Sequence, residues 1–408
     1  MIARGSSSSR LSSALVRSLA VLGVVSHTSG CAPPPPDGVS QELWDLCRDD
    51  LPLNARDCQT VARFRLPEAL PVARGNRYAD DERAARLGRA IFYDEGFANV
   101  PDVSCARCHA PERAFTDGMA VSEVIAGMPG ARNSPSLLVS GRLSGFFLWD
   151  GRADSLWSQP LGALENPIEM GTTRLEIAHR VADVPTYREP YEAIFGALPS
   201  LEDEARFPPV GMPGQPSWEG MSEPDRDAVN RVVANVGKAL EAYMRRIVSG
   251  PSALDRYLDG DRDAMSPDAR RGLARFVETG CTGCHVGPML TDQSFHAGRE
   301  MHDRGRAQGI ETLLASPFNA AGPYFDADAG EALELPLGPE ASDEHAFRTP
   351  SLRNVTLTAP YEHDGSRTLA QILEARSLLY REGDERVIGA FFEALVGEAP
   401  PAEWASAP

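Results

Sequence analysis

Two copies of one pentapeptide contain the residues with the clearest chemical meaning in this chain. The first copy, CARCH, occupies residues 105–109, and the second, CTGCH, occupies residues 281–285. Two thiols three residues apart can form thioether bonds to the two vinyl groups of one haem, and the adjacent histidine then lies beneath the iron as an axial ligand. The pattern therefore predicts two covalently attached haem c groups, held by Cys105, Cys108, His109, Cys281, Cys284 and His285.

A Cys-x-x-Cys pair alone also suits a disulfide, a redox-active dithiol or half of a zinc site. A zinc site would require two such pairs close together, whereas these begin at residues 105 and 281. Each pair is also followed by a histidine at the same offset. Haem attachment is therefore the favoured interpretation.

Length and charge limit the kinds of protein and partner to consider. The chain has 408 residues, enough for two domains, and 42% hydrophobic residues, enough for ordinary cores. Its 58 acidic and 40 basic residues give a formal net charge of -18. This charge disfavours nucleic acid and anionic membrane surfaces as partners, and it is compatible both with a basic electron donor and with simple solubility.

The N-terminal residues 1–30 have the order of an export signal. Arginines come first, an apolar run covers residues 15–25, and small residues precede Cys31. This order resembles a bacterial lipoprotein signal, in which Cys31 would carry the lipid anchor. Thr28 stands where that pattern usually has leucine, so an ordinary cleavable signal remains the alternative. Either signal predicts a periplasmic or otherwise exported protein.

Cys47 and Cys58 are the two cysteines left over from the haem motifs and the signal. In an oxidising exported compartment, a disulfide between them is the natural hypothesis.

The rest of the chain divides by composition. Residues 31–80 are expected to be a proline-rich spacer and an N-terminal extension that wraps the first lobe. A first haem lobe is expected over residues 81–200, a proline-rich linker over residues 201–224, and a second haem lobe over residues 225–398.

Helical periodicity dominates the sequence, so a mainly α fold is predicted. The clearest helix follows a capping pattern at Ser222 and Asp225, and no convincing run of alternating strands is present. Its apolar stripe consists of Val229, Val232, Val233, Val236, Leu240, Tyr243, Met244 and Ile247.

Six further motifs occur in order around the two haem sites. They are FTDG at residues 115–118, RNSP at 132–135, FLWDGR at 147–152, NPIEM at 166–170, TPSLRN at 349–354 and PYEHDG at 360–365. Together they closely resemble the bacterial di-haem cytochrome c peroxidase family, which includes the MauG-type enzymes. The resemblance covers roughly residues 80–397 and omits the N-terminal extension.

The resemblance implies two mostly helical, cytochrome c-like lobes that face each other, preceded here by a loop-rich extension. It implies that hydrogen peroxide reacts at the haem on His109, and that the haem on His285 receives electrons from a donor. Trp149 matches the family's tryptophan between the haems and is interpreted as an electron relay; otherwise it would be an ordinary core aromatic.

Gln159 and Glu169 match the family's pair above the peroxidatic haem. Cleaving the O–O bond requires a proton to be taken from one oxygen and delivered to the other, a task suited to one positioned carboxylate. Glu169 is therefore predicted to transfer the proton, and Gln159, which cannot titrate, to orient the peroxide or a water.

Asn133, Thr358 and Pro360 match positions through which many relatives bind a calcium ion between the lobes. Hard oxygen donors suit calcium, although no EF-hand-like acidic cluster is present. His363, in the same region, could equally make a structural hydrogen bond or act directly.

The chain departs from the family pattern at both irons. No histidine lies between His109 and Trp149, which predicts a five-coordinate or water-bound first haem, ready for peroxide. Classical relatives bind the second iron with a methionine after the HDG motif, but no methionine follows Met301. MauG-type enzymes use a tyrosine, and Tyr380 lies one helical turn from the expected position, Arg376. Tyr380 is thus a candidate ligand; the alternatives are that it only packs, or that Met289 or Met301 ligates.

These observations favour an exported di-haem peroxidase that reduces hydrogen peroxide with electrons from a small protein such as a c-type cytochrome. A MauG-like enzyme that uses peroxide to oxidise a protein or small molecule is the first alternative. The second is a plain electron carrier, which would not need Gln159 and Glu169. A homodimer is expected from the resemblance alone.

Overall fold

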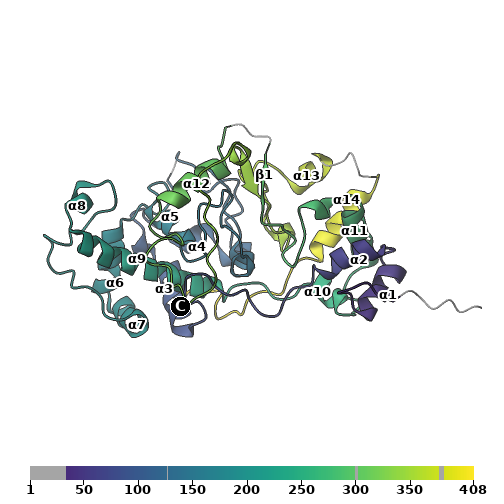
Figure 1. Ribbon diagram of the computed structural model, residues 1–408, viewed down its shortest axis with the longest axis horizontal. Coiled ribbons are helices and arrows are strands. Elements are labelled where there is room, and N and C mark those ends of the chain that lie inside the picture. Colours follow the sequence, from purple (N-terminus) through teal and green to yellow (C-terminus); the bar gives the residue numbers. More distant parts are fainter. Residues whose placement is uncertain (1–33, 126, 299–301, 376–380) are drawn as a thin grey trace, which may run out of the picture. The chain divides into compact units, whose positions relative to one another are not determined.

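Helices form nearly all of the regular structure, as expected. The computed structural model describes residues 34–125, 127–298, 302–375 and 381–408 (Figure 1). The helices are α1 (Gln41–Asp49), α2 (Ala55–Ala62), α3 (Glu82–Tyr93), α4 (Cys105–Cys108), α5 (Gln159–Glu165), α6 (Arg174–Asp183), α7 (Pro185–Phe195), α8 (Pro216–Glu219), α9 (Glu223–Met244), α10 (Ala253–Leu258), α11 (Pro267–Glu278), α12 (Arg306–Ala315), α13 (Leu369–Ala375) and α14 (Asp384–Glu393).

A short antiparallel ribbon completes the regular structure. Strands β1 (Phe295–Ala297) and β2 (Ala346–Arg348) pair with Phe295 opposite Arg348. None of the helices in the described part of the chain is both long and apolar enough to cross a membrane.

The first buried cluster is built on the contact between α3 and α9, with α5, α6 and α7 around it (Figure 1). Ser222 caps α9 by accepting a hydrogen bond from the backbone N–H of Asp225 at 3.3 Å, which confirms the expected start of this helix. Gly88 on α3 faces the backbone carbonyl of Ala239 on α9 so closely that a Cβ atom would collide with it. Glycine at this position therefore allows the two helices to touch through their backbones.

The second buried cluster is built on α11 and α14, and the N-terminal extension packs into it. The extension contributes Leu46 of α1 and, after α1 and α2 respectively, Leu51 and Phe64, among others, to this cluster. The expectation that the extension wraps the first lobe holds only for its later part. Residues 39–64 are buried with residues 254–395, whereas Leu66 and Tyr78 pack against the first cluster and Asn76 binds Glu241 of α9. The predicted disulfide between Cys47 and Cys58 is present and joins α1 to α2.

Residues 201–224, the predicted linker, pack in the first buried cluster and do not separate it from the second. This proline-rich segment buries Leu201, Phe207 and Trp218 in the first cluster, and α9 with Ile247 follows it there. The structure thus differs from the predicted boundary. Prolines and glycines predict an irregular backbone, but they do not show which apolar side chains of that segment are buried in a core. The first cluster also takes in Met289, Phe318 and Tyr324 from later in the chain.

One buried ion pair connects three segments that lie far apart in the sequence. Arg353 donates to both carboxylate oxygens of Asp255 at 2.6 and 2.9 Å, and to the carbonyl of Phe64 at 2.7 Å. Asp255 also accepts from the backbone N–H groups of Ser252 and Leu66. The TPSLRN motif therefore connects α10 to the end of the extension.

Replacing Arg353 with alanine should lower the free energy of unfolding by about 3–5 kcal/mol, because Asp255 would remain buried without its cation. Chemical denaturation of the haem-loaded protein would measure this loss. The matched control is Arg304→Ala, which removes an exposed arginine paired with Glu311 and Glu344 and should leave the free energy of unfolding nearly unchanged, because solvent screens such pairs. Equal effects of the two substitutions would contradict the assignment.

Candidate functional site

The first haem motif forms the single-turn helix α4, and His109 follows as its C-cap residue. The Nδ1 atom of His109 lies 3.1 Å from the carbonyl oxygen of Phe115. Burial lowers the pKa of His109 even though this hydrogen bond acts in the opposite direction. A neutral imidazole that donates from Nδ1 carries its lone pair on Nε2, which is the tautomer that an iron ligand requires.

The second motif repeats this arrangement in a different loop. The Nδ1 atom of His285 lies 2.9 Å from the carbonyl oxygen of Leu290, five residues further along the chain. His285 thus has the same tautomer as His109, fixed again by a backbone carbonyl.

The four cysteines of the motifs fit haem attachment better than the alternatives. None of Cys105, Cys108, Cys281 and Cys284 is in a disulfide. Cys105 packs against the first buried cluster and Cys281 against the second, so the two pairs do not form one four-ligand zinc site. Burial raises the pKa of the Cys105 thiol to about 12, which is the opposite of an activated redox dithiol.

Trp149 forms hydrogen bonds with two segments that lie far apart in the sequence. Its indole N–H donates to the carbonyl of Asn133 at 2.9 Å, and the next residue, Ser134, has its hydroxyl 3.4 Å from Nδ1 of His109. On the other side, the backbone N–H of Arg348 donates to the Trp149 carbonyl at 2.8 Å. The structure therefore places Trp149 between the loop that orients the first histidine and strand β2.

Strand β2 leads in turn to the second histidine. The carbonyl of Thr349, just after β2, accepts a hydrogen bond from the hydroxyl of Thr291 at 2.6 Å. Thr291 follows Leu290, whose carbonyl orients His285. A continuous set of backbone segments and hydrogen bonds thus joins His109 to His285 through Trp149.

Charged side chains fix the loop of residues 146–152, which we call the Trp149 loop. Asp150 forms an ion pair with Arg132, which also binds both carboxylate oxygens of Asp303 at 2.7 and 2.9 Å. Arg306 donates to the carbonyl of Gly151 at 2.7 Å. The loop between the two motifs is consequently anchored by residues from both halves of the chain.

Glu169 is half-buried near the first motif. Its carboxylate accepts a hydrogen bond from the side chain of Asn166 at 2.7 Å. Burial raises the pKa of Glu169, while Asn166 and the charge of Arg152 act in the opposite direction. Burial also raises the pKa of Cys108, and the charge of Glu169 adds to that increase, which places this carboxylate near the first haem attachment. Gln159 is the first residue of α5 and is half-buried.

The residues suggested for calcium come from two loops that touch. The backbone N–H of Asn133 donates to the carbonyl of His363 at 2.8 Å, and the Asn133 amide donates to the carbonyls of Met119 and Ala120. The hydroxyl of Thr358 donates to the carbonyl of Val355 at 3.1 Å, and Pro360 follows in the same loop. Calcium at this place stays a prediction.

The ring of His363 stacks on Phe347, with the ring centroids 3.7 Å apart. Its carbonyl binds Asn133, as described above. These contacts give His363 a place in the packing between the two loops, and a direct role in catalysis stays a prediction.

Several predicted residues lie outside the described part of the chain. These are Cys31, Met301, Arg376 and Tyr380. Met289, one of the alternative iron ligands, is buried against the first cluster. Tyrosine ligation of the second iron therefore stays a prediction.

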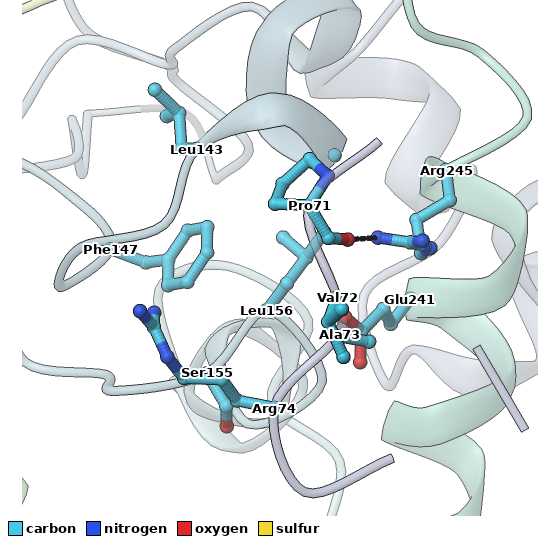
Figure 2. A pocket seen from close by; sticks show the side chains of 11 residues that line it. Pro71, Val72, Ala73, Arg74, Leu143, Phe147, Ser155, Leu156, Glu241 and Arg245 are labelled. Atoms are coloured by element: carbon cyan, nitrogen blue, oxygen red, sulfur yellow. Dashed lines mark hydrogen bonds between the residues drawn. The ribbon is translucent and has the colours of Figure 1, made fainter. Parts of the chain in front are cut away.

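A pocket in the first lobe contains no residue of either haem motif. Figure 2 shows Pro71, Phe147 and Leu156 around it, with Glu241 and Arg245 on one side. Arg245 donates to the carbonyl of Pro71 at 2.9 Å. Burial raises the pKa of Glu241 to about 7. None of its lining residues belongs to a haem attachment motif, and no sequence pattern predicts this pocket.

Comparisons with known proteins agree with the geometry. The sequence profile of the family "Di-haem cytochrome c peroxidase" matches residues 82–263. The methylamine utilization protein MauG of Methylorubrum extorquens is 31% identical over 305 residues, which are 74% of this chain and 70% of that protein. The cytochrome c551 peroxidase of Nitrosomonas europaea is 30% identical over 78% of this chain and 80% of that protein.

A solved structure is also similar. The crystal structure of a MauG-like protein associated with microbial copper homeostasis superimposes with a TM-score of 0.58 and 27% identity, covering 84% of this chain and 98% of that one. The chain belongs to the di-haem cytochrome c peroxidase family, whose members include MauG. It is therefore an oxidoreductase with two haem c groups.

Replacing Cys281 and Cys284 together with alanine should leave one covalently bound haem in place of two, because each motif attaches its haem independently. Intact-mass analysis and haem quantification under denaturing conditions would count them. Cys47→Ser with Cys58→Ser is the control, since this pair forms a disulfide and should not change the haem count. Two covalent haems in the first double variant would refute the attachment site.

Proposed function

We propose that this enzyme is an exported di-haem peroxidase that reduces hydrogen peroxide to water with electrons from a small donor protein such as a c-type cytochrome. The observation that supports this most is the half-buried Glu169 beside the first haem motif, whose pKa is raised by burial. A pure electron carrier has no need of a proton-transfer group in this position.

The proposed chemistry at Glu169 is proton transfer. A haem held by Cys105, Cys108 and His109 would supply the iron and the electrons for peroxide reduction. The Glu169 carboxylate would take a proton from one peroxide oxygen and deliver it to the other, which would leave as water. Asn166 fixes the orientation of Glu169 through its 2.7 Å hydrogen bond. Gln159, which does not titrate, orients the peroxide or a water molecule.

In this proposal electrons enter at the haem on His285 and cross through Trp149. Its support is the double attachment of Trp149 to the loop of His109 and to β2. We further propose an export signal over residues 1–30 with a lipid anchor at Cys31, a calcium ion near Asn133, Thr358 and Pro360, and a homodimer. These finer points rest on the sequence pattern and on the resemblance.

A MauG-like oxidation of a protein or small molecule is the second candidate. The specific observation in its favour is that no methionine follows Met301, so the usual sixth ligand of the second iron is missing and Tyr380 becomes the candidate. Tyrosinate lowers the iron's potential relative to methionine, which favours a long-lived oxidant over rapid electron uptake.

Donor oxidation separates the two candidates. The haem-loaded protein, mixed with hydrogen peroxide and a reduced small c-type cytochrome, should oxidise the cytochrome over many turnovers, as stopped-flow absorbance would record. A long-lived oxidised state of the protein with little donor turnover would contradict the peroxidase proposal and favour the MauG-like one.

The same assay tests Glu169. Glu169→Gln should reduce peroxide turnover by about 10²–10⁴-fold, because the amide cannot accept the proton. Both haems should remain reducible by dithionite. Glu112→Gln, at an exposed position in the turn just after the first haem motif, is the control for a general loss of negative charge. Unchanged turnover in Glu169→Gln would remove it from the mechanism.

The pH dependence gives an independent test. Turnover requires ionised Glu169, so the rate should fall as pH falls through its pKa, and burial puts this fall above the usual glutamate range. Arg152 lowers that pKa, so Arg152→Gln should move the acidic limb of the rate profile to higher pH. The exposed Arg304→Gln should leave it in place; a shift to lower pH in Arg152→Gln would be the wrong sign.

A further inference from the structure

Arg348 is held between the Trp149 loop and the second haem motif. It ends strand β2, where it pairs with Phe295 of β1. Its backbone N–H donates to the carbonyl of Trp149 at 2.8 Å, and its Nε donates to the carbonyl of Leu148 at 3.1 Å. Two hydrogen bonds thus fix both the backbone and the inner part of the guanidinium.

The outer part of this guanidinium is unusual. The Nη1 atom of Arg348 is buried and makes no hydrogen bond within the described part of the chain. Burial lowers the pKa of Arg348 to about 10, and no acidic side chain acts against this shift. A buried charged donor without an acceptor is costly, so a native position for such a group indicates a ligand.

Several other buried arginines of the described residues are paired with acids, and Arg306, which binds backbone carbonyls, has the charges of Asp343 and Asp150 nearby. Arg353 is paired with Asp255, Arg132 with Asp150 and Asp303, and Arg174 with Glu165. In each case a carboxylate of the chain neutralises the guanidinium. Among the described residues, Arg348 donates hydrogen bonds only to backbone carbonyls. No carboxylate of the described residues neutralises its positive charge, so an anion from outside these residues would do so.

A carboxylate suits a guanidinium, and a haem carries two carboxylates as its propionates. A planar guanidinium binds carboxylate oxygens with two parallel hydrogen bonds. Arg348 precedes Thr349, whose carbonyl binds Thr291 beside the Leu290 that orients His285. We infer that the Arg348 guanidinium binds a propionate of the haem attached at Cys281 and Cys284.

This binding would make Arg348 a positioning residue for two groups at once. One residue would hold the second haem through its guanidinium and Trp149 through its backbone N–H. It would also raise the reduction potential of that haem, because a nearby positive charge favours the reduced iron. The inference requires the attached haems and holds equally for a peroxidase and for a MauG-like enzyme.

The test uses the haem-loaded protein and does not depend on activity. Arg348→Gln should lower the midpoint potential of the His285 haem in a spectroelectrochemical titration and shift its propionate bending band in resonance Raman spectra. Arg348→Lys keeps the charge, so it should retain most of the potential. It should still shift the band, because an ammonium cannot form the paired hydrogen bonds.

The matched control is Arg306→Gln. Arg306 is a buried arginine that also holds the Trp149 loop, through the carbonyls of Asp150 and Gly151. Loss of Arg306 should leave the propionate band unchanged. The same band shift in Arg306→Gln would mean that loosening the loop is sufficient, and it would overturn the inference.

Two further results would also overturn it. One is an unchanged potential and an unchanged propionate band in Arg348→Gln. The other is a change confined to the haem on His109, which would assign Arg348 to the first haem. If Arg348→Gln does not fold with its haems, Arg348→Lys decides alone, and an unchanged band in that variant refutes propionate binding.

Discussion

The two hydrogen bonds at opposite ends of Trp149 are the constraint on which the arrangement of the two haem motifs depends. Its indole N–H is held by the carbonyl of Asn133, and its own carbonyl is held by the N–H of Arg348. Neither bond involves a side-chain acceptor that could change rotamer. Movement of either haem loop would therefore displace the indole, and the ion pairs of Arg132 oppose such movement.

The carboxylates of Asp255 and Glu169 have pKa values shifted in opposite directions. At Asp255 the two hydrogen bonds and the charge of Arg353 outweigh the effect of burial, so its pKa is lowered and the group stabilises the fold. At Glu169 the opposing groups are weaker than burial, so its pKa is raised, which is the direction that the proposed proton transfer needs. The opposite shifts of these two carboxylates follow from the strength of their partners more than from the depth of burial.

The sequence predicted those features that depend on spacing along the chain. The haem motifs, the helix that begins after Ser222 and the Cys47–Cys58 disulfide are of this kind, because local periodicity or elimination identifies them. It did not predict the partners of the extension or the role of Arg348. A three-residue strand has no periodicity, and an arginine's lack of a carboxylate becomes visible only when all its neighbours are in place.

The N-terminal part of the described chain packs in the second cluster, and the C-terminal part packs in the first. Residues 39–64 pack with residues 254–395, whereas Trp404 packs in the first cluster, where its carbonyl accepts a hydrogen bond from Tyr243 at 2.9 Å. Neither core is continuous in sequence. A break after Ile247 would therefore yield two fragments that each lack part of their own interior, because the first core needs Trp404 and the second needs residues 39–64.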